Sequence, residues 1–397
     1  MQYRKFGKLD FQVSALGFGA MRLPVIEENS PNKIKNPAPS NVNEIEAIGM
    51  VRYAIDHGVN YIDTGYFYHG GESEKVIAKA LKGGYREHVK IATKLPVYLV
   101  ETKADFDRFF NEQLERLEVD KIDFYLLHAL TGKFWKKLHA LGIIPWLEGL
   151  LAKGKIEYTG FSFHDNFNNF KIIADSYDNW ALCQLQYNYM DIDEQAGKRG
   201  VEYAASKDLG VVIMEPLRGG QLTKTPPPKI SQLWNSAVKK RSLAEWGLQW
   251  LWDQEEISAV LSGMSTMDQV VENVSLAKMS GTGEFTDADR QLVKKVRKAY
   301  KGLRPVPCTS CGYCMPCPNG VDIPGVFNMY NDSCMYEDPD HGKLWYNNQY
   351  GFNQDQRADK CNNCETCLEK CPQNVSIPYW LEKAHLEMLV KTQNIAA

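Results

Sequence analysis

The sequence is poor in three features: long apolar runs, net charge, and cysteine over its first three quarters. No apolar stretch approaches the length of a membrane span, and the 397 residues carry a formal net charge of only −3. The chain opens on an alternating pattern rather than on an apolar export segment. These absences argue against partners such as nucleic acid or membranes, and we expect a cytoplasmic protein.

Cysteine is concentrated near one end of the chain. Ten cysteines are present, and nine follow residue 300, whereas Cys183 is the single one before it. A disulfide scaffold would spread its cysteines over the fold and needs an oxidising compartment. Nine thiols in one short region instead predict metal binding.

The first 280 residues alternate between short apolar runs and segments with helical spacing, such as Glu72–Leu81 and Ala104–Leu117. Eight strands separated by helices favour a (β/α)8 TIM barrel over a doubly wound sheet. A hairpin around Lys8-Leu9-Asp10 is expected to close its floor. The predicted strands are Val13–Phe18, Val59–Ile62, Val89–Ala92, Ile122–Leu127, Tyr158–Phe161, Cys183–Leu185, Val211–Ile213 and Ala259–Leu261.

Three regions follow from this pattern. Residues 1–280 are predicted to form the barrel, with surface loops at Pro24–Asn43 and at Pro226-Pro227-Pro228. Residues 281–303 are expected to be a helical linker containing Asp287–Tyr300. Residues 304–397 are expected to form a mainly helical and loop domain, ending in a helix from Trp380.

The cysteines of this last region form two similar motifs. Cys361, Cys364, Cys367 and Cys371 stand as C-x2-C-x2-C-x3-C before a proline, the pattern of bacterial ferredoxins that bind 4Fe-4S clusters. The near copy, with only two residues before its fourth cysteine, comprises Cys308, Cys311, Cys314 and Cys317. Structural zinc uses separated C-x-x-C pairs instead.

Two such motifs predict two 4Fe-4S clusters that exchange their fourth ligands. One cluster would take its three thiolates from the first motif and its fourth from Cys371. The other would take three from the second motif and its fourth from Cys317. Because the first motif is shortened, Cys334 is an alternative ligand, although a buried bystander thiol fits a lone cysteine better.

Chemistry in TIM barrels lies at the carboxyl ends of the strands. The predicted ends carry Gly19, Asp63, Lys94, His128, Ser162, Gln184, Met214 and Gly263. The chain resembles the aldo-keto reductase family over nearly all of residues 1–280, and the segments that carry the resemblance are Tyr61–Tyr68, Ala92–Lys94, Asp123–His128, Gly160–Ser162 and Gln184–Asn188.

The resemblance implies a catalytic tetrad of Asp63, Tyr68, Lys94 and His128. Tyr68 would donate a proton to a substrate carbonyl, with its phenolate favoured by Lys94, which Asp63 holds. His128 would orient the substrate oxygen. Taken singly, Asp63 and Lys94 also fit a structural ion pair, and His128 fits a core histidine; Tyr66 is a competing acid.

The resemblance also implies binding of NADP or NAD. Ser162 and Gln184 would hold the nicotinamide amide, and Gly263, Ser265 and Asn273 would follow its phosphate and adenine end. The chain departs from the family where Met214 replaces a stacking aromatic residue and Gln269 replaces a basic one. Within Leu217-Arg218-Gly219-Gly220, Arg218 is an alternative cation or a solvated loop residue.

Three functions follow as hypotheses. The first is reduction of a small aldehyde or ketone, or oxidation of the alcohol, with the clusters relaying electrons. Because hydride carries two electrons and a cluster passes one, the second places a flavin (FMN or FAD) in the barrel and links it to a ferredoxin or another redox protein. The third is an electron-transfer subunit whose barrel serves as a scaffold.

Substrate specificity is expected to lie in the loops Tyr98–Lys103, Ala129–Trp135 and Leu222–Ser236. Phe134, Trp135 and Trp234 would make an aromatic pocket there, although core aromatics are the commoner explanation. Exposed clusters degrade in oxygen, so an anaerobic or microaerobic source is expected.

Overall fold

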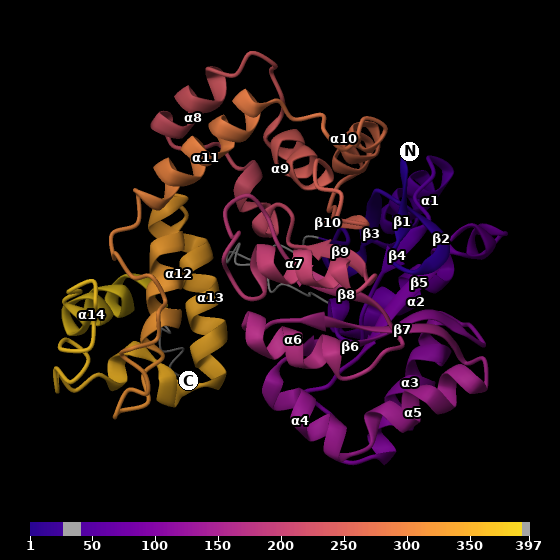
Figure 1. Ribbon diagram of the computed structural model, residues 1–397, viewed down its shortest axis with the longest axis horizontal. Helices are drawn as coiled ribbons and strands as arrows, with labels where there is room; N and C mark the ends of the chain where they lie inside the picture. Colours follow the sequence, from indigo (N-terminus) through magenta and orange to yellow (C-terminus); the bar gives the residue numbers. More distant parts are fainter. Residues whose placement is uncertain (27–40, 391–397) are drawn as a thin grey trace, which may run out of the picture. The chain divides into compact units, whose positions relative to one another are not determined.

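The structure, a computed structural model, describes residues 1–26 and 41–390 (Figure 1). Its larger part is built around a closed barrel of eight parallel strands. The strands pair in chain order, and the last closes the ring on the first. This confirms the predicted (β/α)8 class. The barrel strands are β3 (Leu16–Gly19), β4 (Tyr61–Asp63), β5 (Lys90–Leu95), β6 (Ile122–Leu130), β7 (Ile156–Phe163), β8 (Trp180–Gln186), β9 (Gly210–Met214) and β10 (Ala259–Gly263).

A two-stranded antiparallel hairpin precedes the barrel, as predicted, and consists of β1 (Tyr3–Phe6) and β2 (Leu9–Ser14). Its turn falls at Gly7-Lys8, one position earlier than expected. The prediction of one strand over Val13–Phe18 was wrong, because that apolar run spans the end of β2 and the start of β3. Apolar character continues across the break since both strands are buried there.

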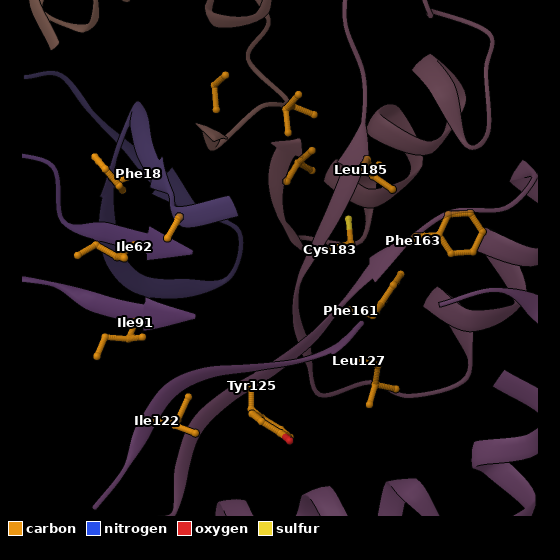
Figure 2. Close-up of a cluster of buried hydrophobic side chains, with 14 of the residues drawn as sticks. Phe18, Ile62, Ile91, Ile122, Tyr125, Leu127, Phe161, Phe163, Cys183 and Leu185 are labelled. Carbon is orange, nitrogen blue, oxygen red and sulfur yellow. The ribbon is translucent and has the colours of Figure 1, made fainter. Parts of the chain in front are cut away.

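Side chains of the strands alternate between two buried layers. The outer layer, between strands and helices, includes Ile62, Leu127 and Cys183 (Figure 2). The interior layer is completed by Phe6 and Val13 of the hairpin. Its other buried members are Tyr61, Ala92, Phe124, Leu126, Ala181, Leu182, Val212, Ala259 and Leu261.

Helices follow the strands around the barrel. The predicted Ala104–Leu117 helix is α3 (Ala104–Leu117), and the other is α2 (Glu72–Ala80). The remaining helices of this part are α1 (Glu44–Asp56), α4 (Gly132–Ala140), α5 (Ile143–Ala152), α6 (Phe167–Asp175), α7 (Gly197–Ser206), α9 (Leu243–Trp252) and α10 (Met267–Ala277), with 3-10 turns η1 (Ala20–Arg22), η2 (Tyr68–Gly71), η3 (Tyr85–His88) and η4 (Arg218–Thr223).

Two of the three expected specificity loops contain helix. Most of Ala129–Trp135 is taken by the end of β6 and the start of α4, and Leu222–Ser236 contains α8 (Pro228–Asn235). Pro228 begins that helix because a proline needs no hydrogen-bond acceptor at the first helical position. Part of the Pro24–Asn43 loop lies outside the described residues.

The described residues divide into two compact units. The first comprises 1–26, 41–224 and 239–290, and the second comprises 225–238 and 291–390. α11 (Asp287–Lys301) runs across the boundary, and the second unit continues with α12 (Ile323–Met335), α13 (Pro339–Phe352), two 3-10 turns, η5 (Gln354–Gln356) and η6 (Ala358–Lys360), and α14 (Ile377–Met388). The final helix therefore begins three residues before the predicted Trp380.

The second unit has its own small core. Buried side chains from the three long helices meet there, and several cysteines pack against its edge. The buried members are Val306, Val321, Ile323, Val326, Phe327, Tyr330, Tyr346, Tyr350, Ala358, Val375, Ile377, Leu381, Ala384 and Met388.

Across residues 1–26 and 41–390, none of the helices combines the length and apolar character that crossing a membrane requires.

Candidate active site

Three polar side chains stand at the carboxyl ends of adjacent strands. Asp63 ends β4, Lys94 lies near the end of β5, and His128 lies in the last part of β6. Each follows an interior-layer residue of its own strand by two positions, so the alternation of a strand turns it toward the barrel axis. One rim of the barrel therefore collects the residues that the sequence identifies.

Lys94 is the centre of the cluster. Its Nζ donates to Oδ1 of Asp63 at 2.6 Å, to the carbonyl oxygen of Thr64 at 2.6 Å and to the hydroxyl of Tyr68 at 3.0 Å. Lys94 is 1% exposed and Asp63 is 3% exposed. An ammonium has three hydrogens to donate, so all three are used and the buried charge is balanced by the Asp63 carboxylate.

The pKa values of this cluster follow from burial and neighbouring charge. Burial acts to lower the pKa of Lys94, but Asp63 and Tyr68 outweigh it, and the pKa lies above its usual value. Burial raises the pKa of Tyr68, Lys94 lowers it, and the Asp63 and Glu215 carboxylates raise it again, so that the pKa lies above its usual value. The phenol therefore keeps its proton in the free protein, as a proton donor must, while Lys94 acts to lower its pKa.

His128 lies against the Tyr68 ring, with ring centroids 5.7 Å apart and the rings nearly perpendicular. Burial, then the Lys94 charge and His164, hold the pKa of His128 well below its usual value, so the imidazole is neutral. Its Nδ1 is buried and has no hydrogen-bond partner among the described residues. A neutral imidazole carries one N–H, and a buried N–H without an acceptor is costly, which favours a proton on Nε2.

A tight turn presents Tyr68. A Cβ atom at Gly65 would lie 3.1 Å from Cζ of the Tyr68 ring, so a side chain at this position would crowd the ring that folds back over it. The next residue, His69, is buried and has a left-handed backbone with φ 55°. Its Nε2 accepts a hydrogen bond from the backbone N–H of Leu23 at 3.0 Å. The turn is thus tied to the segment after β3.

Tyr66, the competing acid, has other partners. Its hydroxyl donates to Glu112 of α3, and the Arg116 guanidinium lies over its ring at 4.1 Å. The two tyrosines of the motif therefore make different contacts: Tyr68 meets Lys94, and Tyr66 meets a helix.

The residues expected to hold a nicotinamide amide lie at the same rim. Ser162 and Gln184 are paired in register on β7 and β8 and are both buried. Gln184 donates a hydrogen bond to Oδ2 of Asp63, a link that sequence reasoning missed. Ser162 Oγ accepts from the backbone N–H of Ala129 at 2.8 Å. Met214, in the place of a stacking aromatic, is half-buried at the end of β9.

Arg218, the expected alternative cation, is occupied. Its Nε donates to the buried Asp191 at 2.8 Å. Sequence reasoning missed Arg22, whose stem lies 3.2–3.4 Å from where a Cβ of Gly263 would stand and whose guanidinium approaches Gly219. The sequence does place Arg22 only three residues after Gly19, which was identified as a strand end, and this closeness could have pointed to it.

The segment after β10 is held by internal bonds. Ser265 donates through Oγ to the carbonyl of Arg22 at 2.9 Å, and its backbone N–H donates to Oε1 of Gln269 at 2.8 Å. Asn273 donates to Ser262 at 2.8 Å. Gly19 and Gly263 are paired in register, so this part of the rim presents backbone without side chains. Leu217 packs against the core nearby.

Two of the expected pocket aromatics are core residues. Trp135 and Trp234 are only 6% and 7% exposed, and Trp135 packs edge-on against Trp180. Phe134 is partly buried against the same outer layer. The helical periodicity of α4 and α8 turns Trp135 and Trp234 into the core, which is the commoner of the two explanations that the sequence offers.

In the second unit, cysteines of both motifs line one pocket. Its thiols are Cys308, Cys311 and Cys314 from the first motif and Cys371 from the second. Apolar side chains complete the lining, among them Phe327 of α12. These four residues are the set that the sequence analysis groups together.

The remaining motif residues also lie near one another. Burial raises the pKa of the Cys367 thiol, and the neighbouring Cys361, Cys317 and Cys364 raise it further. All ten cysteines are free thiols, including Cys334 beside Tyr330 on α12. Within the described part of the chain, no three Cys, His, Asp or Glu side chains are close enough to hold a single metal ion.

Comparison with known proteins identifies the barrel. The model of the aldo/keto reductase family matches residues 15–293, so the cysteine motifs lie beyond the match. L-galactose dehydrogenase of Arabidopsis thaliana is 30% identical over 298 residues, which cover 69% of this chain and 88% of that protein. An uncharacterized oxidoreductase of Bacillus subtilis is 26% identical, and the match covers 70% of this chain and 91% of that protein.

Solved structures of aldo-keto reductases have a similar fold. An aldo-keto reductase of Bacillus halodurans in its holo form is 26% identical, with a TM-score of 0.61, and the likeness covers 75% of this chain and 96% of that one. An aldo-keto reductase of Klebsiella pneumoniae, solved with NADPH, shares the fold at 22% identity, with a TM-score of 0.55 and coverage of 75% and 95%. The chain therefore belongs to the aldo/keto reductase family and is an oxidoreductase of that family.

Proposed function

We propose that the barrel interconverts a small aldehyde or ketone and its alcohol, using NADP(H) or NAD(H), at the tetrad of Asp63, Lys94, Tyr68 and His128. The observation that carries this proposal is the chain of hydrogen bonds from Asp63 through Lys94 to the Tyr68 hydroxyl. A phenol bonded to a buried, fully paired ammonium is suited to give up a proton.

Each residue has a distinct task in the reduction. Tyr68, protonated because its pKa is raised, gives its proton to the carbonyl oxygen as negative charge develops there. Lys94 then stabilises the phenolate that remains, and Asp63 keeps Lys94 charged and in place. His128, neutral and with its proton on Nε2, donates a hydrogen bond to the same substrate oxygen and orients it.

The rim suits a nicotinamide dinucleotide, which supplies or accepts the hydride when bound. Ser162 accepts one hydrogen bond and keeps its own O–H to donate to the amide group. The paired Gly19 and Gly263 let a phosphate approach the backbone closely. Arg22, whose guanidinium lies 3.8 Å from the Glu215 carboxylate and is partly exposed, offers a cation between Gly263 and Gly219. The Klebsiella pneumoniae relative, solved with NADPH, supports the same class of cofactor.

We further propose that the second unit binds two 4Fe-4S clusters that relay single electrons to a ferredoxin or another redox protein. The pocket lined by three thiols of one motif and one of the other supports the first cluster. The proximity of Cys317 to Cys367, Cys361 and Cys364 supports the second. A cubane spreads its ligands over four irons, so their thiols stand farther apart than those around one ion.

The free thiols favour a reducing compartment, so we place the protein in the cytoplasm. Two curated relatives bear the names of a dehydrogenase of a hydroxylated sugar and of an oxidoreductase. These names support a small carbonyl or alcohol substrate for this chain.

Anaerobic purification, elemental analysis and steady-state assays test the two proposals separately. We expect about eight irons and eight sulfides per chain, and reduction of aldehydes that consumes NADPH or NADH. Zinc without sulfide would contradict the clusters. A tightly bound flavin, released on denaturation, would contradict direct reduction by a nicotinamide and favour the ferredoxin-linked flavin alternative.

A further inference from the structure

Tyr98 stands at the edge of the tetrad without a task in it. It lies in the turn that follows β5, where the backbone N–H of Leu99 donates to the carbonyl of Pro96 at 2.9 Å. Its ring stacks on Phe67 with centroids 4.7 Å apart and an interplanar angle of 20°. The ring of His128 lies 6.2 Å away. Tyr98 therefore flanks the position of the substrate.

The hydroxyl of Tyr98 differs from those of Tyr66, Tyr68 and Tyr125. Tyr66 donates to Glu112, Tyr125 donates to Gln113 at 2.8 Å, and Tyr68 accepts from Lys94. The Tyr98 hydroxyl makes no hydrogen bond to any atom of residues 1–26 or 41–390, although its side chain is half-buried. Burial raises its pKa, and the Tyr68 and Tyr66 hydroxyls act in the same direction, so it is a neutral phenol.

We infer that the Tyr98 hydroxyl binds a hydroxyl group of the substrate, so that the enzyme selects carbonyl compounds carrying a hydroxyl near the carbonyl carbon. This inference rests on the proposed function, because it needs the substrate oxygen at Tyr68 and His128. The carbons next to a carbonyl bound there would come within reach of Tyr98, because its ring lies 6.2 Å from the ring of His128.

The surroundings of Tyr98 favour a neutral partner over an anion. Its aromatic neighbours Phe67 and His128 are uncharged, and the ammonium of the tetrad, Lys94, has all three hydrogens engaged. A phenol both donates and accepts, which matches the chemistry of an alcohol. The Phe67–Tyr98 stack adds an apolar face for the carbon atoms between the hydroxyls.

Two aldehydes of equal carbon number test the inference: glyceraldehyde, which carries hydroxyls, and propanal, which does not. For the unmodified protein we expect a higher kcat/KM on glyceraldehyde. In Tyr98→Phe, the ratio of kcat/KM for glyceraldehyde to that for propanal should fall about tenfold, as the loss of one hydrogen bond predicts. The fall should come from KM rather than kcat.

Tyr66→Phe is the matched control, because it also removes one phenol oxygen from the same region. We expect it to leave the ratio of the two aldehydes unchanged, since Tyr66 meets Glu112 instead of the substrate. An unchanged ratio in Tyr98→Phe, or an equal fall in Tyr66→Phe, would overturn the inference alone. Failure of the unmodified protein to reduce either aldehyde would overturn the proposed function and the inference with it.

Discussion

The rim of the barrel and the cysteine loops of the second unit hold their reactive side chains in different ways. Strands fix Asp63 and Lys94, which are buried and bonded to each other. In contrast, residues 302–322 and 361–376 contain no helix or strand, and Cys311 and Cys364 are exposed. The first site is organised by protein contacts, whereas the second offers thiols on irregular backbone.

This difference teaches what each site needs from its ligand. The tetrad has its charges balanced by protein groups, so its geometry does not depend on a bound cofactor. Loops that carry metal ligands gain much of their order from the metal, because its binding free energy adds to that of folding. Substituting a reactive side chain should therefore change catalysis in the barrel, whereas substituting a cysteine should change the structure of the second unit.

The largest expected effect is on catalysis. Tyr68→Phe should lower kcat for carbonyl reduction about 10³-fold, because the proton donor is lost while the ring still packs on Gly65. Steady-state kinetics measures this, and iron and sulfide analysis of the same preparation should give unchanged contents. Retention of most activity would contradict the tetrad and favour the scaffold hypothesis.

The next effect concerns the clusters. Cys371→Ser should remove the cluster held by the first motif, because Cys371 shares a pocket with Cys308, Cys311 and Cys314. We expect the iron content to fall from about eight to about four per chain, with loss of helical order in the second unit seen by hydrogen exchange. The barrel should keep its protection from exchange.

Cys317→Ser is the reciprocal variant and should remove the other cluster. Low-temperature EPR of each reduced variant, compared with Cys361→Ser and Cys308→Ser, identifies which cluster is lost. If Cys371→Ser and Cys361→Ser give the same spectrum, each motif keeps its own fourth ligand, and the exchange of ligands is wrong.

A smaller effect is expected on the pH profile. Burial sets the pKa of Tyr68 above its usual value, Lys94 lowers it, and Asp63 raises it. Reduction needs the protonated phenol, so the rate is high below the pKa of Tyr68 and falls as the pH rises through it. Asp63→Asn removes a raising influence and should move this alkaline limb down by about one pH unit.

The control for this shift is the reverse reaction. Alcohol oxidation needs the phenolate, so its rate should rise through the same pKa and move in the same direction in Asp63→Asn. A limb that moves to higher pH would show that the variant has displaced Lys94 instead of removing a charge.

Much of this organisation is predictable from the sequence. Alternation along strands identifies Asp63 and Lys94 at adjacent strand ends, and cysteine spacing groups the thiols that line the pocket. Two features are not predictable in this way. The net pKa of Tyr68 depends on the balance of burial and charge, and the bond from Gln184 to Asp63 crosses the barrel.

The smallest effect sharpens the claim that protein contacts alone organise the barrel site. His69 fixes the turn beside Tyr68 through its bond from the Leu23 N–H, in a left-handed conformation that Asn also tolerates. His69→Asn should keep most of the kcat, whereas His69→Ala should lose about fivefold through misplacement of Tyr68. His69→Gly separates the two causes, because glycine relieves the backbone cost but offers no acceptor. If His69→Gly matches the unmodified protein, the bond to Leu23 does not position Tyr68, and the backbone conformation alone is what the turn requires.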